Sequence, residues 1–537
     1  MDKEERKFLM LPEFDVIIVG SGPAGVSAAF PLVQAGLKVL MVDGGKEASV
    51  APPSHPFLTE RFYNTEQWKW IVGESFHALR KMDAVSPKLR VPTHSYVFDD
   101  FINSNHIETN NFVAVGSLAK GGLSNAWGCG VSRLSAKELA EFPFPESDIE
   151  RSYEAVTRRI GVSGASDDDL SDYFGVDAWS QAPIQMDLLH QRLFDQYSSN
   201  RSELISPLGF RLGRSRVAVL SHDYAGRKAC DLSGNCLWGC HRHSLYSSAD
   251  ELPSLMKHKN FHFRSGFVVD RVASDGEYVS AEGQYGTDGI RITAKKMILA
   301  AGTLATTRLA LLALKHDSPI QLQSCPTAAF LLWLPKMLGM PRENSFGLGQ
   351  LSFTLKLTDE VSAFGSTFST VGIPVAEFVR HLPLRKRYGI DLLRYLLSSC
   401  LVGNMFLPGI LSTTKVSLNV DGEFKINGGC SEDVPSLMTD AAIRLRKSYW
   451  RLGALLLPMS FTTGRHGGDI HYSSTLPMRL KPVLGETDAQ GELAGLVGIH
   501  VVDGACLSTL SEKSHTLTIM ANADRIGRVL ATKMKGN

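Results

Sequence analysis

The sequence lacks an excess of charge of either sign. Its 56 Lys and Arg residues are matched by 55 Asp and Glu residues, and the formal net charge is +1. A protein dedicated to nucleic-acid binding normally carries a basic excess, so the composition disfavours that class of partner. Low-complexity tracts are absent too. With 44% hydrophobic and 21% charged residues, the chain has the composition of a globular protein and not of a disordered one.

Long hydrophobic runs are also lacking. Residues 1–7 mix charges of both signs and no apolar stretch precedes Phe14, which disfavours a secretory signal. Two segments, 318–335 and 395–414, contain no Asp, Glu, Lys or Arg, but Pro and polar residues interrupt both. A membrane-spanning helix needs ~20 predominantly apolar residues. We therefore interpret both segments as buried core, with contact with a membrane surface as the alternative.

Cysteine is scarce, with 8 residues in the chain, and only Cys230, Cys236 and Cys240 lie close together in the sequence. Disulfides belong to oxidising compartments, so a chain without a secretory signal is not expected to carry a disulfide framework. We predict a reducing, cytoplasmic location, with peripheral membrane contact as the alternative. At 537 residues the chain is too long for one compact core and is expected to contain more than one domain.

The first motif that is present is a strand, a tight glycine turn and a helix. An apolar run of strand length, FDVIIV at 14–19, leads directly into GSGPAG at 20–25, and a second apolar run, LKVLMVD, ends at Asp43. This context makes the glycine pattern typical of a dinucleotide-binding fold. The first glycine makes the turn, the second lets the backbone approach a pyrophosphate, and the third lets the helix pack on the sheet. Free N–H groups at the helix start would hold the phosphates, and Asp43 would accept the ribose hydroxyls.

Two later segments repeat the pattern of a buried strand followed by a helix. Residues 296–302 (KMILAAG) precede a helical stretch at 304–314, and residues 498–504 (GIHVVDG) precede another at 516–532. These segments predict one Rossmann-like α/β domain that is assembled from discontinuous parts of the chain. The predicted parts are residues 14–160, 225–315 and 462–537.

The intervening residues 161–224 and 316–461 are predicted to form a second, inserted α+β domain that binds the substrate. Alternation of apolar and polar residues with a period of 2 indicates strands. Such runs occur at 351–357, 361–370 and 415–426, and they predict an antiparallel-type sheet in the inserted domain.

The order of the motifs resembles that of the glucose–methanol–choline (GMC) family of FAD-dependent oxidoreductases. The matching motifs are GSGPAG at 20–25 with Asp43, GGLSNAW at 121–127, ILAAGTLATTR at 298–308, HYSSTLPM at 471–478, and VVDGA at 501–505 followed by HTLTIM at 515–520. The resemblance covers most of the chain and is weakest in the inserted segments. It implies a Rossmann-like FAD domain and a substrate domain whose sheet lies over the flavin.

The resemblance also implies where FAD binds. The loop at 121–127 would lie along the flavin, while Asp503 and the turn at 515–518 would hold its ring and ribityl side. The residues expected to bind FAD are Gly20, Ser21, Gly22, Pro23, Ala24, Gly25, Asp43, Gly44, Gly121, Gly122, Ser124, Asn125, Trp127, Val269, Ala301, Gly302, Asp503, Gly504, Thr516 and Leu517. Some carbohydrate-oxidising members attach FAD through a His in this loop. The loop here offers Asn125 and no His, so we expect dissociable FAD.

His471 and His515 match the family's catalytic pair, in which one residue is His and the other is His or Asn. Alcohol oxidation by a flavin needs a base for the hydroxyl proton, and an imidazole with an ordinary pKa of ~6.5 suits that task. The resemblance implies that His471 is the base and His515 its hydrogen-bonding partner, or the reverse. His466 is a weaker candidate for the same pocket. Ser474 stands where Gly is common in the family and is expected to narrow the pocket.

The three clustered cysteines, at C-x5-C-x3-C spacing, resemble those of FAD sugar dehydrogenases that hold a [3Fe–4S] cluster. Thiolates are the usual protein ligands of such clusters, which would accept flavin electrons one at a time. Zinc is a second interpretation, because His241 or His243 would complete a Cys₃His set. The third interpretation is that the three cysteines are buried free thiols.

The sequence therefore predicts an FAD-dependent oxidoreductase, a dehydrogenase or an oxidase, that acts on a CH–OH group of a carbohydrate or polyol-like substrate. The electron acceptor would be oxygen, a quinone or a partner protein reached through the cluster. One alternative is an enzyme of hydrophobic or lipid-linked alcohols that receives substrate at a membrane through segments 318–335 and 395–414. Another is an electron-transfer flavoprotein subunit, which would not need the histidine pair.

Overall fold

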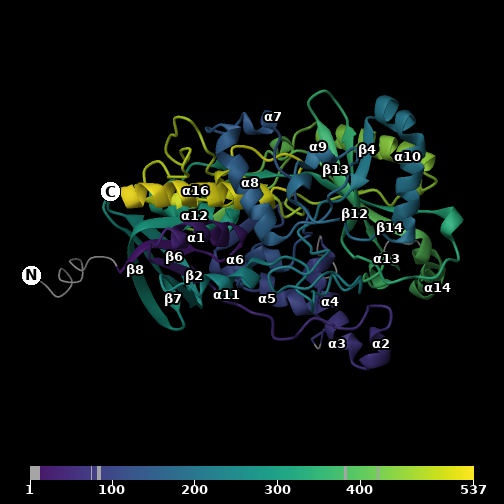
Figure 1. The fold of residues 1–537 in the computed structure, drawn as a ribbon, viewed down its shortest axis with the longest axis horizontal. Coiled ribbons are helices and arrows are strands. Elements are labelled where there is room, and N and C mark those ends of the chain that lie inside the picture. The colour runs from purple at the N-terminus through teal and green to yellow at the C-terminus, as the bar shows by residue number, and fades with distance from the viewer. Residues whose placement is uncertain (1–12, 74, 81–85, 380–383, 420–421, 537) are drawn as a thin grey trace, which may run out of the picture.

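The protein is described by a computed structural model that covers residues 13–73, 75–80, 86–379, 384–419 and 422–536. The charged segment 1–7 lies outside the described residues. The molecule is elongated, with a helix-covered sheet near both termini and a second sheet towards the opposite end (Figure 1). The functional cavity described below lies between these two sheets.

The first sheet has seven strands in the order β5-β2-β1-β8-β7-β6, with β20 also paired to β8. Its strands are β1 (Phe14–Val19), β2 (Val39–Asp43), β5 (Phe261–Ser265), β6 (Phe267–Ser274), β7 (Val279–Tyr285), β8 (Asp288–Leu299) and β20 (Ile499–Val501). β1 runs parallel to both β2 and β8, and β20 runs parallel to β8. Three distant parts of the chain thus build one sheet, which confirms the predicted Rossmann-like α/β class.

Helices cover this sheet because their apolar faces are buried against it and against one another. α1 (Pro23–Gln34) packs on the C-terminal helix α16 (Thr516–Gly536), which also contacts α8 (Glu146–Ile160). α12 (Thr303–Leu314) follows β8 directly. Figure 1 shows α16 beside α1, although these two helices come from opposite ends of the chain. This packing joins the last segment to the first.

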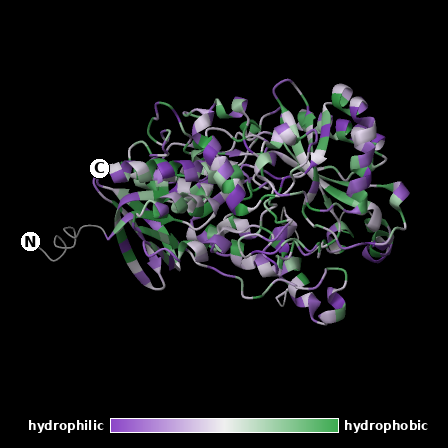
Figure 2. Cartoon of the chain, viewed as in Figure 1, coloured by the Kyte–Doolittle hydropathy of each residue, from purple (hydrophilic) through white to green (hydrophobic). Residues whose placement is uncertain are grey.

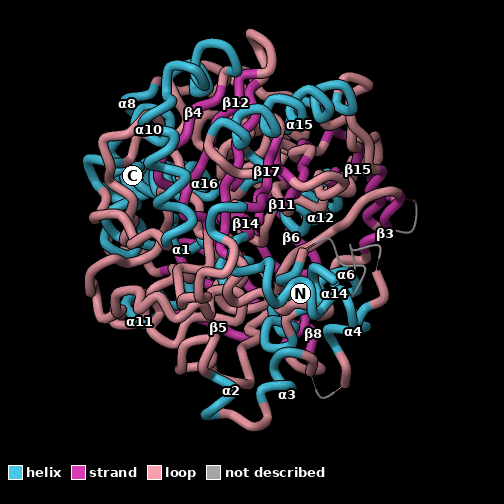
Figure 3. Tube along the Cα trace, turned by 90° about the vertical axis from the view of Figure 1, so that its right-hand side faces the viewer, coloured by secondary structure: helices cyan, strands magenta, loops and turns pink. Residues whose placement is uncertain are grey.

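The second sheet is antiparallel, in the order β17-β11-β14-β13-β12-β4, with β18 paired to β11. Its strands are β4 (Phe210–Arg214), β11 (Thr327–Trp333), β12 (Gly349–Lys356), β13 (Ser362–Ser369), β14 (Cys400–Phe406), β17 (Leu455–Leu456) and β18 (Thr462–Thr463). Helices α10 (Leu188–Leu208) and α15 (Val434–Arg451) share a buried apolar cluster with it (Figure 3). The strand β4 joins from residues before 225, so two separate segments complete this sheet. The division of the chain into domains at 160, 224, 315 and 461 stays a prediction.

The run at 415–426 does not join the second sheet, contrary to the prediction. It forms a hairpin of β15 (Lys415–Leu418) and β16 (Phe424–Asn427) in a separate four-stranded sheet with β3 (Ile107–Asn110) and β9 (Ile320–Gln321). Its apolar side chains pack into a cluster with the buried leucines of α12. The alternation indicated strands correctly, but their partners were set by this long-range apolar contact.

The longest element that lies wholly within each uncharged segment is a strand. Segment 318–335 contains β11 and segment 395–414 contains β14, and these strands pair with each other in the second sheet. Phe330 and Leu332 of β11 and Leu401 and Met405 of β14 are buried, and Figure 2 colours the chain by hydropathy with apolar residues in green. Of the helices in the described ranges, none has the length and apolar character that crossing a bilayer requires.

Short helices complete the fold around these layers. They are α2 (Glu60–Tyr63), α3 (Gln67–Ile71), α4 (His77–Arg80), α5 (Ser95–Phe98), α6 (Phe101–Ser104), α7 (Ala136–Leu139), α9 (Ser171–Phe174), α11 (Leu252–Leu255), α13 (Ala376–Val379) and α14 (Lys386–Leu396), together with the short strands β10 (Gln323–Ser324) and β19 (Tyr472–Ser473). β10 and β19 pair as a two-stranded ribbon, which fixes the chain just after His471.

Candidate active site

A cavity of about 1050 Å³ lies between the two sheets. One end is formed by the carboxyl ends of β1 and β2 and by the start of α1, where open α/β sheets bind their ligands. The opposite wall is formed by residues of β11, β13 and β14 in the second sheet. The cavity therefore extends from the glycine turn of the first sheet to His471 and His515 near the second sheet.

The glycine turn at the start of α1 is shaped for close backbone approach. Gly20 has a φ of +103°, and a Cβ there would lie 2.4 Å from the carbonyl oxygen of Ala300. A Cβ at Gly25 would lie 2.0 Å from the carbonyl oxygen of Gly20. A Cβ at Gly22 would meet nothing within 4 Å, because this residue faces the cavity. Protein atoms exclude side chains at the first and third glycines, while the second leaves room for a pyrophosphate.

Asp43 is held at the end of β2 by three hydrogen bonds. The backbone N–H and hydroxyl of Ser21 donate to Asp43 Oδ2 at 2.9 and 2.8 Å, and the N–H of Gly45 donates to Oδ1 at 2.7 Å. Burial raises the pKa of Asp43 to about 6, against the lowering effect of these donors. A carboxylate oxygen accepts about two hydrogen bonds, so Oδ1 keeps a position for a ribose hydroxyl.

The loop at 121–127 is fixed by its own polar groups. Asn125 Nδ2 donates to the carbonyl oxygens of Lys120 and Gly122 at 2.7 and 2.9 Å, and its Oδ1 accepts from Ser247 Oγ at 2.9 Å. The Asn125 side chain therefore holds the loop in shape and does not line the cavity. A Cβ at Gly122 would lie 3.4 Å from Gly22 Cα, so the loop lies directly against the glycine turn.

Asp503 joins the end of β20 to the start of α12. Its Oδ2 accepts from the Gly302 N–H at 2.9 Å and from the Thr306 hydroxyl, and its Oδ1 accepts from the Ala505 N–H at 3.0 Å. Burial raises the pKa of Asp503 to about 6. The carboxylate fixes the two backbone segments that form this side of the cavity.

Most of the residues predicted to bind FAD line this cavity. They are Gly20, Gly22, Pro23, Ala24, Asp43, Gly44, Gly122, Ser124, Trp127, Val269, Ala301, Gly302, Asp503, Gly504 and Thr516. Five others do not line it: Ser21, Gly25, Gly121, Asn125 and Leu517. Ser21 holds Asp43, Gly25 lets the helix approach the turn, and Leu517 is fully buried in the core. These residues support the cavity wall from behind.

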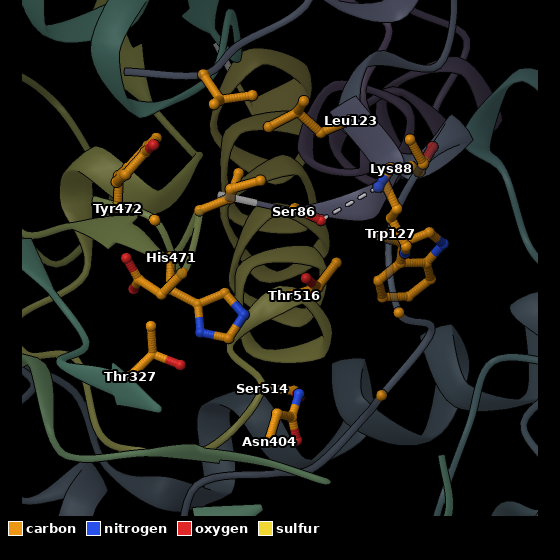
Figure 4. A pocket seen from close by; sticks show the side chains of 18 of the residues that line it. Ser86, Lys88, Leu123, Trp127, Thr327, Asn404, His471, Tyr472, Ser514 and Thr516 are labelled. Atoms are coloured by element: carbon orange, nitrogen blue, oxygen red, sulfur yellow. Dashed lines mark hydrogen bonds between the residues drawn. The ribbon is translucent and has the colours of Figure 1, made fainter. Parts of the chain in front are cut away.

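The structure brings His471 and His515 together at the far end of the cavity. His471 lies immediately before β19 and His515 immediately before α16, and both line the cavity. Their ring centroids are 4.9 Å apart with an interplanar angle of 76°. Figure 4 shows the His471 ring near Thr327, and Asn404 beside Ser514. His466 does not line this cavity, although it lines a neighbouring one.

Both imidazoles are held in the neutral form by burial. Desolvation lowers the pKa of His471 to about 4 and that of His515 well below its ordinary value, with the charge of His471 as a further cause for His515. The Nδ1 atoms of both rings are buried and have no hydrogen-bond partner among the described residues. A neutral imidazole has a lone pair to accept a proton. The pair therefore offers proton acceptors towards the cavity.

Asp469 is a buried acid beside His471 that the sequence analysis did not single out. Its Oδ2 accepts from the Cys325 N–H at 2.7 Å, while its Oδ1 is buried without a partner in the described part of the chain. Burial raises the pKa of Asp469 to about 8. Ligand atoms of Cys325, Asp469 and His471 lie within 4.8 Å of one another, so these side chains could hold a metal ion. The sequence signal that could have pointed to Asp469 is its position two residues before His471.

Comparisons with known proteins agree with this geometry. Residues 14–99 match the family described as pyridine nucleotide-disulphide oxidoreductase. The chain is 22% identical over 573 aligned residues to paromamine 6'-oxidase of Streptomyces fradiae, with 96% of this chain and 91% of that protein covered. Its fold is similar to that in the crystal structure of pyridoxine 4-oxidase from Mesorbium loti, with a TM-score of 0.60, 14% identity, and 98% and 100% of the two chains covered.

Over most of its length the chain is thus similar in sequence to one oxidase and in fold to another. The glycine turn with open space at Gly22, and the Asp43 carboxylate with an acceptor position left, fit an FAD cofactor. Ser474 does not line the cavity, so the expectation that it narrows the pocket is wrong. It has a φ of +64°. Glycine adopts this conformation without the steric cost that other residues meet, which explains a Gly at this position in relatives.

The clustered cysteines lie outside the cavity lining. Cys230, Cys236 and Cys240 do not form a group of ligand atoms within 4.8 Å among the described residues. The imidazoles of His241 and His243 are each paired with an aspartate instead, at 3.3 and 2.9 Å. This arrangement does not assemble the Cys₃His zinc set. The [3Fe–4S] interpretation stays a prediction.

Proposed function

We propose that the protein oxidises a CH–OH group of a carbohydrate or polyol-like substrate. The observation that carries this proposal is the pair of neutral imidazoles, His471 and His515, at the end of the FAD cavity. Bound FAD supplies the acceptor for the hydride that leaves the substrate carbon. The chain itself must bind the hydroxyl, remove its proton and hold the carbon in place.

In the proposed reaction, His471 accepts the hydroxyl proton and His515 donates a hydrogen bond to the oxygen as it becomes a carbonyl. Burial favours neutral imidazoles, so the ring that accepts the proton is in its basic form before the reaction. The two rings are close to perpendicular, and this lets both address one oxygen atom. The opposite assignment of the two roles uses the same geometry.

The wall of the second sheet supports a substrate with several hydroxyl groups. Thr327 and Ser352 line the cavity together with Ser366 and Asn404. Ser352 Oγ lies 2.9 Å from Ser366 Oγ, and Asn404 Oδ1 accepts the Ser366 N–H at 3.0 Å. Hydroxyls and an amide on a wall that is largely made of apolar residues are the kind of polar groups that orient a small ligand. Both comparison proteins named above are oxidases, and this favours oxygen as the acceptor over an exit through the three cysteines.

The test is anaerobic mixing of the holoenzyme with a panel of sugars, polyols and aliphatic alcohols while the visible flavin absorption is followed. Bleaching with a sugar or polyol, lost in His471→Ala and retained in the exposed-residue control His222→Ala, supports the proposal. Bleaching that is equally fast in His471→Ala would contradict the assigned base. FAD content measured on each variant separates loss of cofactor from loss of chemistry.

A second candidate, an enzyme of hydrophobic or lipid-linked alcohols at a membrane, is favoured by one feature. Around α14, Leu384, Tyr388, Leu392 and Tyr395 are exposed by 47%, 61%, 42% and 76% and recur at helical spacing. Leu393 of the same helix lines the cavity. The helix also carries Lys386, Arg387 and Arg394, which complement an anionic lipid surface. Sedimentation with anionic vesicles, compared with Tyr388→Ser/Tyr395→Ser, tests this candidate.

A further inference from the structure

Lys88 brings a positive charge into the cavity that the reaction scheme above does not use. It lies in a 3₁₀ turn, Pro87–Arg90, and lines the cavity together with Trp127 and Gly128. Figure 4 shows it beside Trp127, on the same side of the cavity. Its backbone N–H donates to Ser86 Oγ at 3.4 Å, which closes the turn that presents it.

The other buried cations of the cavity wall have acidic partners. Arg90 pairs with Glu377, and Arg216 pairs with Asp168 at 3.0 Å and with Asp177. The Lys88 ammonium forms no ion pair or hydrogen bond within the described ranges. Because a buried charge without a partner is costly, the cavity around Lys88 is suited to a negatively charged occupant.

Burial lowers the pKa of Lys88 to about 8, and the side chain is still mostly protonated at neutral pH. The titratable groups that influence it are Cys129 and Cys236, and Lys88 in turn lowers the pKa of His94. None of these is an acid that is ionised near neutral pH, since burial raises the pKa of Cys129 to about 12. Protein groups therefore do not neutralise the ammonium.

Lys88 lies beside the loop at 121–127, which is expected to lie along the flavin, and Figure 4 shows its side chain next to Trp127 of that loop. Its neighbour Cys129 precedes Gly130, where a Cβ would lie 2.8 Å from Ser514 Oγ. Ser514 directly precedes His515, and both line the cavity. The glycine turn, where FAD phosphates are expected, is formed by other residues. The charge of Lys88 thus lies beside the loop expected to lie along the flavin and not at the glycine turn.

We propose that the Lys88 ammonium stabilises the negative charge that FAD gains when it accepts a hydride. In the reaction, the substrate hydroxyl loses its proton to the histidine pair, and its carbon loses a hydride, with both electrons, to the flavin. The substrate becomes a neutral carbonyl, the base gains one positive charge and the flavin gains one negative charge. A preorganised cation beside that charge stabilises the transition state for its formation.

This inference rests on the proposed function only in that FAD occupies the cavity. An anionic group on the substrate is the competing occupant, because it would also pair with a buried ammonium. The reduced flavin and a substrate anion predict different consequences of the Lys88 charge. A cation near the flavin changes the properties of bound FAD without any substrate, whereas a receptor for a substrate anion changes only substrate binding.

The test compares Lys88→Met, which removes the charge at similar size, with Lys88→Arg, which keeps it. The exposed and paired Lys228→Met serves as a control. Each holoenzyme is titrated with sulfite, which adds to oxidised flavin and places a negative charge on it, and the midpoint potential of FAD is measured. We expect Lys88→Met to weaken sulfite binding at least tenfold and to lower the potential by at least about 30 mV, the two-electron equivalent of a tenfold change.

Lys88→Arg and Lys228→Met are expected to behave like the parent enzyme. Their affinity for sulfite should stay within about twofold of its value, and their midpoint potential within a few millivolts. The inference is overturned if Lys88→Met retains full FAD with unchanged sulfite affinity and potential, including the case in which only its KM for substrate rises. These readouts need no turnover, so they stand even if the proposed substrate class fails. Loss of FAD from Lys88→Met is resolved by repeating both measurements on Lys88→Gln and Lys88→Arg reconstituted with excess FAD.

Discussion

The ring centroids of His471 and His515 lie 4.9 Å apart, with the two planes at 76°. One residue precedes a short strand and the other precedes the last helix of the chain, so two separate elements hold this pair. Their positions fix where a hydroxyl group can be bound and where its proton can go.

Replacing His471 by Ala is expected to slow anaerobic reduction of bound FAD by roughly 10²–10⁴-fold, the usual contribution of a positioned base. FAD should remain bound, because His471 lies away from the glycine turn. Stopped-flow spectroscopy of the flavin band measures the rate. His515→Asn should lose less than His515→Ala, since an amide can still donate a hydrogen bond to the substrate oxygen. Equal losses in these two variants would argue against a hydrogen-bonding role for His515.

Two glycine variants should separate folding from cofactor binding. Gly25→Ala would place a Cβ 2.0 Å from a backbone oxygen, so we expect loss of several kcal/mol of stability or failure to fold. Gly22→Ala meets no protein atom within 4 Å and should fold, but its Cβ occupies the space left for the pyrophosphate. Thermal unfolding of the apoprotein and FAD titration measure the two effects. A Gly22→Ala variant that binds FAD as tightly as the parent would contradict the placement of the phosphates.

The affinity for FAD should fall as the pH drops below about 6. The pKa of Asp43 is raised to about 6 by burial, and the ionised form is the better acceptor for ribose hydroxyls. The carboxylate is therefore present above this pH and is lost below it, so the dissociation constant should rise by up to about tenfold per pH unit. Asp43→Asn should bind FAD weakly at every pH and flatten the profile. An unchanged profile in this variant would assign the pH dependence to another group.

Metal analysis decides the role of the clustered cysteines. The visible spectrum of protein purified without air should show flavin bands, and iron and acid-labile sulfide are measured on the same sample. About three irons per chain, lost in Cys236→Ser, would establish a cluster and favour a dehydrogenase with a separate acceptor. Because the three sulfur atoms do not all lie within 4.8 Å of one another, we expect no zinc at this site. Stoichiometric zinc that is lost in Cys236→Ser would contradict this expectation.

Part of the site follows from local sequence, because local backbone geometry depends on residues close in the chain. The order of Gly20, Gly22 and Gly25 after an apolar strand predicted a turn, an open position and a close packing contact, and the three Cβ environments match these roles. The strands and helices around them were also predictable from apolar periodicity. The cysteine spacing was less informative, since spacing alone does not place three thiols around one ion.

Other features depend on contacts between distant residues, which spacing cannot encode. The hairpin at 415–426 was predicted as strands, but its apolar contact with α12 placed it in a different sheet. Asp469 and Lys88 carried no motif, and only the assembled cavity shows that each is buried without a full set of partners. Local pattern decides which backbone conformations form, whereas long-range packing decides which charges are removed from water and face the same cavity.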